Sequence, residues 1–350
     1  MTDDQIRVGI NGFGRIGRTV ARQVVANPQL RLVAVNDYAE DLGNLAYLYN
    51  YDSTYGRAPS RAAVLNETSK SFVLDGHSVS CFREFDVVNT QWESAGVDVL
   101  VEATGVSSNV DGSHVLVRDE RVRKVIVTHC PSVPVDIHLL VGVNEAEYDP
   151  LVHHVIASGI CDANAIVHPI VHLDDCFGIE SGFVTTLHPW LSYQNLVDAP
   201  TVMQNSPGHF WTDYALGRSS VSTLIPKETT AVSALSPVIP DLASKLEAFS
   251  FRVPTSIVST ADLTIRLSTE PSIDLVRLAL EDLCATSRVV EANYESLVGV
   301  DYRGSTASAT IDMQWLKVSG DMLKLIVWYD NEWGYSARVV DLVERVGSMQ

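Results

Sequence analysis

The sequence predicts an α/β protein of two domains, the first built on a parallel sheet and the second an α+β domain with a large mixed or antiparallel sheet. Three observations lead to this fold class. The 350 residues are enough for about two domains. The first half alternates continuous apolar strands with helical segments, as parallel sheets do. The second half carries several strand-like segments and few helices.

The N-terminal segment combines a strand, a glycine-rich turn and a helix. Residues 7–10 predict the strand and residues 18–26 the helix, with Gly12, Gly14 and Gly17 between them. Gly12 permits a tight turn, Gly14 lets the backbone approach a pyrophosphate, and Gly17 lets the helix pack closely on the strand. The helix N-terminus then faces the anion. This order predicts a Rossmann domain that binds a dinucleotide.

The ends of the following strands identify the expected cofactor. The next predicted strand, residues 32–37, ends in Asp37. Its carboxylate can accept hydrogen bonds from ribose hydroxyls and would repel a 2′-phosphate, so we expect NAD rather than NADP. Two later apolar strands end at Thr104 and Thr128, where they would line the cofactor crevice or simply cap the strands.

The second half offers a cysteine and a histidine as a reacting pair. Cys161 lies at or just before the start of a buried helix over residues 165–173, where the helix dipole favours a thiolate. His188 follows a predicted strand over residues 178–187. An imidazole that takes the thiol proton allows nucleophilic catalysis.

A metal site on that helix is the alternative that we considered and did not favour. His168, His172 and Cys176 recur at four-residue intervals. The spacing matches no metal motif with a mechanical reason, so we interpret these residues as packing and predict no metal site. The five cysteines include no CxxC, which argues against a zinc ribbon.

The remaining segments complete the second domain. A long polar loop covers residues 192–217, and a loop of that length is usually functional or part of an interface. The further predicted elements are a helix from about Thr229, strands over 248–254, 256–267, 308–315 and 322–329, a helix over 273–284, a turn over 330–335 and a last helix over 336–346.

The composition limits partners and location. A formal net charge of −18 argues against nucleic acid or an anionic membrane as a partner. The N-terminus lacks a signal-peptide pattern, and no apolar run has the length of a membrane span. We therefore expect a cytoplasmic protein.

Seven motifs, in order along the chain, resemble the glyceraldehyde-3-phosphate dehydrogenase family, which includes erythrose-4-phosphate dehydrogenase. The resemblance covers essentially the whole chain. The motifs are Asn11-Gly-Phe-Gly-Arg-Ile-Gly-Arg18, Val35-Asn-Asp37, Glu102-Ala-Thr-Gly105, Cys161 with Asn164, Thr185-Thr-Leu-His188, Phe251-Arg-Val-Pro-Thr255 and Trp328-Tyr-Asp-Asn-Glu-Trp-Gly-Tyr335.

The resemblance implies a domain division and an activity. Residues 1–160 and 331–350 would form the NAD-binding Rossmann domain, with the C-terminal helix returning to it, and residues 161–330 the catalytic domain. The chain would be a homotetramer that oxidises a small anionic aldehyde. Cys161 would be the nucleophile that forms a hemithioacetal and then a thioester, and His188 the general base. The loop over 192–217 would reach toward a neighbour's cofactor.

The resemblance also implies roles for binding residues. Thr229 and Arg252 fall where the family binds inorganic phosphate and substrate phosphate, and Arg218 falls in an arginine cluster reduced here to one residue. Asn331 would contact the nicotinamide amide, and Tyr335 would lie beside its ring. The other implied cofactor contacts are Gly12, Arg15, Ile16, Asp37 and Thr128.

The sequence departs from the family next to the nucleophile. The family reads Ser-Cys-Thr-Thr-Asn, whereas this chain reads Ile160-Cys-Asp-Ala-Asn164. Leu191 and Tyr193 replace polar residues on the substrate-phosphate side, and Thr230 replaces a glycine. Asp162 would raise the Cys161 pKa and disfavour inorganic phosphate. It either caps the helix or takes part in substrate selection or water activation.

Three functions fit this pattern. The first is an NAD-dependent aldehyde dehydrogenase with altered substrate or acyl-acceptor specificity, in which phosphate or water cleaves the thioester. The second is an ordinary phosphorylating glyceraldehyde-3-phosphate dehydrogenase. The third is a weakly catalytic NAD-binding paralogue that acts as a sensor or scaffold, which the retained Cys161 and His188 argue against.

Overall fold

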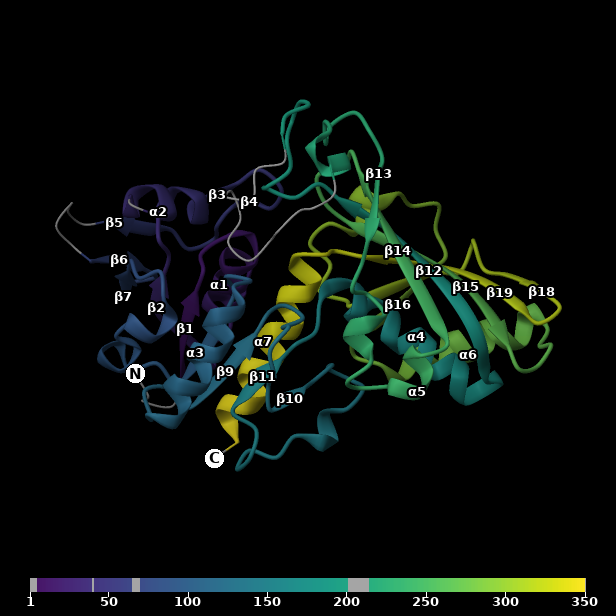
Figure 1. The fold of residues 1–350 in the computed structure, drawn as a ribbon, viewed down its shortest axis with the longest axis horizontal. Coiled ribbons are helices and arrows are strands. Elements are labelled where there is room, and N and C mark those ends of the chain that lie inside the picture. The colour runs from purple at the N-terminus through teal and green to yellow at the C-terminus, as the bar shows by residue number, and fades with distance from the viewer. Residues whose placement is uncertain (1–4, 40, 65–69, 201–213, 350) are drawn as a thin grey trace. The chain divides into compact units, whose positions relative to one another are not determined.

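The computed structural model describes residues 5–39, 41–64, 70–200 and 214–349 (Figure 1). The chain divides into two compact units: residues 1–139, 146–158 and 336–350 form the first, and residues 140–145 and 159–335 form the second. This division differs from the one expected at 160/161 and 330/331 by assigning residues 140–145, 159–160 and 331–335 to the second unit.

The first unit is built on a nine-stranded sheet with the order β10-β11-β9-β8-β1-β2-β7-β6-β5. The strands from β10 to β7 run parallel, and β6 and β5 continue the sheet antiparallel. All four residues of β8 and of β9 are buried, as expected for strands covered on both faces.

The elements of the first unit are β1 (Ile6–Asn11), α1 (Arg15–Ala26), β2 (Leu30–Asn36), α2 (Leu42–Asn50), β3 (Tyr51–Asp52), β4 (Gly56–Arg57), β5 (Ala62–Val64), β6 (Ser71–Leu74), β7 (His77–Phe82), β8 (Val99–Glu102), α3 (Ser107–Arg118), β9 (Lys124–Val127), β10 (Ile137–His138) and β11 (Val155–Ala157). The predicted Rossmann arrangement of strand, glycine turn and helix is therefore present at the N-terminus.

The last helix, α7 (Trp333–Ser348), belongs to the first unit from Ser336 onward. Ser336 Oγ lies 2.6 Å from Thr19 Oγ1 on α1, and Asn27 donates to the Glu344 carboxylate. Gly347 lies against Ile6, so close that a Cβ there would be 2.7 Å from Ile6 Cγ2. The C-terminal helix thus packs beside the first helix and the first strand.

The second unit is an eight-stranded mixed sheet with the order β13-β14-β12-β15-β19-β17-β16, and β18 pairs with β19. Its strands are β12 (Ile179–Pro189), β13 (Ile225–Glu228), β14 (Leu246–Val253), β15 (Ser259–Leu267), β16 (Val290–Asn293), β17 (Ala309–Asp312), β18 (Lys317–Ser319) and β19 (Met322–Tyr329). The helices are α4 (Cys161–Phe177), α5 (Pro240–Ala243) and α6 (Ile273–Thr286). Helix α4 packs against β12, β15, β17 and β19.

Two expectations about elements need correction. Helix α4 begins at Cys161, four residues before the predicted start. The helix expected from Thr229 is wrong: the chain forms only a 3₁₀ turn over Ser233–Leu235 and the short α5. Pro237 and Pro240 interrupt that segment, because proline lacks the N–H and clashes with the preceding turn of a helix.

Part of the expected long loop lies outside the described residues, namely 201–213. Residues Tyr214–Gly217 form a 3₁₀ turn. Among the helices of the described ranges, none is both long and apolar enough to span a bilayer.

Candidate active site

Cys161 and His188 meet in the second unit. Cys161 is the first residue of α4, after Gly159 in a left-handed conformation (φ 69°), and Asn164 Nδ2 donates to Ile160 O at 3.0 Å. His188 lies near the end of β12. Cys161 Sγ is 3.8 Å from His188 Nε2, within reach of a weak hydrogen bond to sulfur. The structure therefore brings the predicted nucleophile and base together.

The carboxylate of Asp162 lies between the nucleophile and the sheet. Asp162 is 4% exposed. Cys161 Sγ donates to its Oδ1 at 3.4 Å, and Thr229 Oγ1 is 3.5 Å from its Oδ2. Asp162 lies in the first turn of α4, as the capping alternative requires, but its carboxylate bonds to these side chains rather than to helix amides.

Tyr329 is a site residue that the sequence did not reveal. Its buried hydroxyl donates to Asp162 Oδ1 at 2.7 Å. Tyr329 ends β19, whose alternating burial could have shown that the side chain faces the core. Burial and the neighbouring Asp162 raise its pKa well above the usual value, so the phenol stays protonated and donating.

Burial and charge set the proton positions of the reacting pair. Burial, and then the Asp162 carboxylate, raise the Cys161 pKa well above 9. Burial, with a smaller effect of the Arg252 charge, lowers the His188 pKa to about 4. His188 Nδ1 is 2.9 Å from the Pro189 carbonyl oxygen, which can only accept, so Nδ1 carries the proton of the neutral ring. Nε2 therefore presents a lone pair to a protonated Cys161.

Arg252 provides a buried cation beside this pair. It lies on β14 directly opposite His188 of β12 and is 8% exposed. Its Nε has no hydrogen-bond partner among the described residues, while the hydroxyl of Tyr193 is hydrogen-bonded to the side chain. A buried guanidinium with an unused N–H suits an anion.

Arg218 does not join these residues. Its side chain is 64% exposed and forms a surface ion pair with Asp198, with Nε 2.7 Å from Oδ2. The structure thus assembles Cys161, Asp162, His188, Thr229 and Arg252, whereas Arg218 lies apart from their contacts.

The glycine loop of the first unit fits a dinucleotide. A Cβ on Gly17 would lie 2.0 Å from Gly12 O, so the helix can approach the strand only without a side chain there. A Cβ on Gly14 would meet nothing within 4 Å, which leaves its backbone open to a pyrophosphate. Asp37 Oδ2 accepts from Phe13 N at 2.8 Å, so the carboxylate lies beside the loop.

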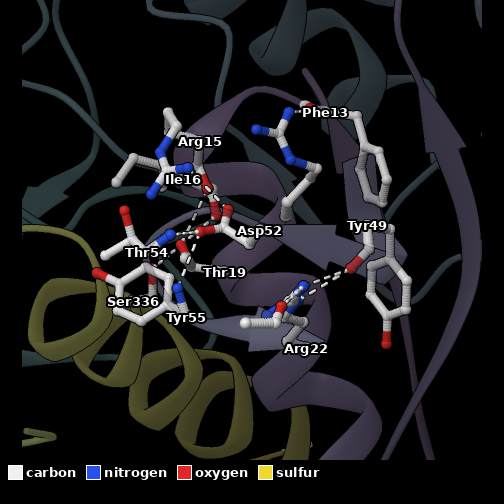
Figure 2. Close-up of polar contacts among 12 residues, drawn as sticks. Phe13, Arg15, Ile16, Thr19, Arg22, Tyr49, Asp52, Thr54, Tyr55 and Ser336 are labelled. Carbon is white, nitrogen blue, oxygen red and sulfur yellow. Dashed lines mark hydrogen bonds and ion pairs between the residues drawn. The ribbon is translucent and has the colours of Figure 1, made fainter. Parts of the chain in front are cut away.

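Arg15 is tied to a neighbouring turn. Figure 2 shows Asp52 accepting from Arg15, Thr54 and Tyr55; Arg15 Nη1 is 2.7 Å from Asp52 Oδ2. The Arg15 guanidinium also lies 5.8 Å from the centroid of the Tyr55 ring. Arg15 and Ile16 open α1, so their backbone N–H groups are at the end that favours anions.

The two strand-end threonines hydrogen-bond to Glu102. Thr104 donates to the Glu102 carboxylate, and Thr128 Oγ1 donates to Glu102 O at 3.1 Å. These bonds match the alternative in which the threonines cap strand ends. Asn331 and Tyr335 lie in the second unit. Asn331 Oδ1 is buried and accepts no hydrogen bond from the part of the chain that the structure describes, and Tyr335 Oη donates to Gly159 O at 3.0 Å.

Comparisons with known proteins agree on one family along the chain. Residues 6–110 match the model of the glyceraldehyde 3-phosphate dehydrogenase NAD binding domain, and residues 160–331 that of its C-terminal domain. The chain is 37% identical over 347 residues to glyceraldehyde-3-phosphate dehydrogenase of Geobacillus stearothermophilus, with 98% of each chain covered. It is 37% identical to glyceraldehyde-3-phosphate dehydrogenase 1 of Bacillus subtilis, with 96% of this chain and 97% of the relative covered. It is 35% identical to glyceraldehyde-3-phosphate dehydrogenase 1 of Kluyveromyces lactis, with 97% of this chain and 99% of the relative covered.

Proposed function

Because the chain belongs to the glyceraldehyde 3-phosphate dehydrogenase family and is an NAD-dependent oxidoreductase, we propose that it oxidises a small anionic aldehyde through Cys161 and passes the acyl group to water. The single observation that carries this proposal is the buried Asp162 carboxylate, 3.4 Å from the Cys161 sulfur. Both the altered acceptor and an altered substrate follow from the residues around it.

The acceptor argument rests on charge. Thr229 is the residue expected at an inorganic-phosphate site, and its hydroxyl lies 3.5 Å from Asp162 Oδ2. On this proposal, an attacking phosphate is therefore set directly against this carboxylate. Two like charges ~5 Å apart at an effective dielectric of ~20 repel by roughly 3 kcal/mol, and a phosphate dianion by more. Water carries no such penalty.

The protein groups supply the proton transfers. His188 Nε2 takes the Cys161 proton as the sulfur bonds to the aldehyde carbon, so the thiolate forms only when substrate is present. The N–H of Cys161 and the His188 side chain are candidate donors to the resulting oxyanion. The glycine loop after β1 would hold NAD, which would supply the hydride acceptor for the oxidation. His188 then releases the proton it took from Cys161 to solvent, and in the hydrolytic step the neutral ring or the Asp162 carboxylate accepts a proton from the attacking water.

The substrate argument rests on Arg252. Its unused Nε–H and its place beside His188 suit an anionic group on the aldehyde. Leu191 and the bulky Tyr193, bonded to Arg252, stand where polar residues were expected. We therefore propose that the substrate differs from glyceraldehyde 3-phosphate in the size or position of its anion.

The ordinary phosphorylating reaction is the second candidate. It is favoured by the relatives, which are named glyceraldehyde-3-phosphate dehydrogenase and match almost the whole chain. A homotetramer, a cytoplasmic location, and the lack of nucleic-acid or membrane partners also stay predictions.

NADH formation by the purified full-length protein distinguishes these candidates. The panel comprises phosphorylated, phosphonylated and carboxylated aldehydes, each with and without phosphate or arsenate. We expect at least one anionic aldehyde to be oxidised at a rate that neither anion changes. Turnover of glyceraldehyde 3-phosphate that depends on phosphate, at about 1–1000 s⁻¹, would establish the second candidate. Inertness toward every aldehyde with intact NAD binding would favour a sensor or scaffold.

A double variant tests the cause of the altered acceptor. Ile160→Ser with Asp162→Thr removes the carboxylate and restores two hydroxyls, and we expect phosphate to accelerate NADH formation in this variant. The matched control is Asp175→Asn, which makes the same charge change at an exposed position of the same helix. If the double variant stays indifferent to phosphate, Asp162 does not select the acceptor.

A further inference from the structure

The nucleophile and two side chains beside it are close enough together to bind one metal ion. Within the described residues, one ligand atom each from Cys161, Asp162 and His188 lies within 4.8 Å of the other two. The sulfur is 3.4 Å from Asp162 Oδ1 and 3.8 Å from His188 Nε2. Zinc bonds of about 2.3 Å to sulfur and about 2.0–2.1 Å to nitrogen or oxygen place tetrahedral ligands roughly 3.5 Å apart. The two separations from the sulfur are close to the edges of such a tetrahedron, and the third ligand pair lies within 4.8 Å.

Neighbouring groups hold two of these ligands in the orientation that a metal needs. The Pro189 carbonyl fixes the proton of His188 on Nδ1, which leaves the Nε2 lone pair directed at the sulfur. The Tyr329 hydroxyl donates to Asp162 Oδ1 and fixes the carboxylate. Metal sites in proteins use the same kind of supporting hydrogen bonds to orient histidine and carboxylate ligands.

The charges of the cluster also favour a divalent cation. Asp162 opposes a bare thiolate at Cys161, but a cation between the two removes that repulsion. One thiolate and one carboxylate neutralise a divalent ion, and a neutral imidazole completes a three-ligand set with an open fourth position. Asp162 and His188 are buried, whereas Cys161 is partly exposed, so an ion can enter from the Cys161 side.

We propose that Cys161, Asp162 and His188 form a binding site for a thiophilic divalent cation, best filled by Zn²⁺, which reversibly blocks the reacting pair. On binding, the Cys161 S–H bond breaks, a sulfur–zinc bond forms, and the proton leaves to solvent, with no change of oxidation state. The bound ion occupies both the thiol and the Nε2 lone pair, so neither can act on an aldehyde.

This site is distinct from the helix residues considered in the sequence. Cys176 Sγ and His172 Nε2 lie 3.7 Å apart near the other end of α4. They are not part of a cluster of three possible ligands in the described ranges. The pair still offers a sulfur and a nitrogen, which makes Cys176→Ser a matched control for binding at Cys161.

The experiment uses the reduced full-length protein and Co²⁺ as a spectroscopic probe. We expect one Co²⁺ per chain, with the sulfur-to-metal charge-transfer and ligand-field absorption of a tetrahedral thiolate site. Zn²⁺ should displace it, abolish NADH formation in proportion to its occupancy, and release activity again on chelation. Cys176→Ser should leave these results unchanged.

Asp162→Thr and Asp162→Asn test the third ligand. Loss of a supporting hydrogen bond alone typically weakens a metal site 10–100-fold, so loss of this ligand should weaken Co²⁺ binding by about 100-fold or more. Circular dichroism and NAD binding report whether each variant folds. Equal Co²⁺ affinity in a folded Asp162→Thr protein, or loss of binding in Cys176→Ser, would overturn the proposal.

X-ray absorption of the zinc-loaded parent protein tests the site without any variant. The expected first shell has one sulfur and two or three nitrogen or oxygen atoms. A shell with no sulfur, or with two, contradicts the proposed ligands.

Discussion

The Cys161 thiol lies between a carboxylate that holds its proton and an imidazole that can take it. Burial and Asp162 raise its pKa well above 9, whereas the pKa of His188 is lowered to about 4. The neutral thiol and the neutral ring are therefore the stable pair at neutral pH. Only a small fraction of Cys161 is thiolate before substrate arrives, which makes the free enzyme a poor target for alkylating agents.

Alkylation of Cys161 by iodoacetamide should report this directly. Because the folded-state pKa is raised, we expect slow modification at neutral pH and a rate that still climbs with pH above 9. Asp162→Thr removes the repulsive charge and should accelerate alkylation at neutral pH by roughly 10–100-fold. Peptide mass spectrometry of Cys161 over time gives the rates, with Asp175→Asn unchanged. A parent rate already at its plateau below neutral pH would mean a preformed thiolate–imidazolium pair instead.

Single residues of the site differ in how far the sequence could identify them. Cys161 and His188 could be predicted because a helix start and a strand end place a thiol and an imidazole where they can meet. The hydrogen-bond partner of Asp162 could not be predicted, because Tyr329 is 167 residues away in the sequence. Strand alternation shows which way Tyr329 faces but not what it faces. The bond between Arg252 and Tyr193 depends on tertiary packing in the same way.

At the scale of elements, two glycines of the same turn meet opposite constraints. Gly14 has φ −70°, which any residue can adopt, and open space around its missing side chain. A Cβ added to Gly17 would lie only 2.0 Å from Gly12 O. One glycine thus keeps a surface open, and the other lets α1 pack on β1.

Substituting each glycine by alanine should separate binding from folding. Gly14→Ala should change the free energy of unfolding by no more than about 0.5 kcal/mol, yet weaken NAD binding about tenfold or more, because the methyl group occupies the approach of the pyrophosphate. Gly17→Ala should destabilise the first unit by about 3 kcal/mol or more through overpacking. Calorimetry of NAD binding and urea unfolding measure both effects. Equal stability loss in the two variants would contradict this assignment.

Where the local sequence pattern is strong, the predicted element agrees with the structure, and where it is weak, the prediction fails. The predicted strand over 322–329 coincides with β19, since it is a mostly apolar segment bounded by polar and turn residues. The failed helix after Thr229 shows the converse. Its alanine and leucine residues favour a helix, but Pro237 and Pro240 limit the segment to a 3₁₀ turn and the four-residue α5.

At the scale of the whole molecule, the order of the strands lay beyond the sequence. Strand β12 pairs in parallel with β14 and antiparallel with β15, although β13 comes between β12 and β14 in the chain. The hydrophobic pattern predicts that each of these strands has one buried and one less buried face, but it does not predict which strands are neighbours. Helix α4 covers the face of the sheet that carries the buried Val184, whereas the opposite face carries the exposed Phe183.

That opposite face carries exposed aromatic residues. Phe183 on β12 is 62% exposed and Phe249 on β14 is 43% exposed, and strand register places them on the same side, two residue pairs apart. A hollow of about 620 Å³, lined in part by Leu187, Trp190 and Trp328, lies along the same strands. An exposed apolar patch on a sheet is typical of a subunit interface. We therefore expect this face to join copies of the chain in the predicted homotetramer.

Light scattering coupled to gel filtration tests this assembly. The parent protein should have about four times the chain mass of 38.3 kDa. Phe249→Asp buries a charge in the expected interface and should shift the mass toward dimers or monomers, because an unpaired buried charge costs several kcal/mol. Phe85→Asp is the matched control, since Phe85 is 71% exposed in the first unit. A Phe249→Asp protein that stays tetrameric while Phe85→Asp dissociates would place the interface on the first unit instead.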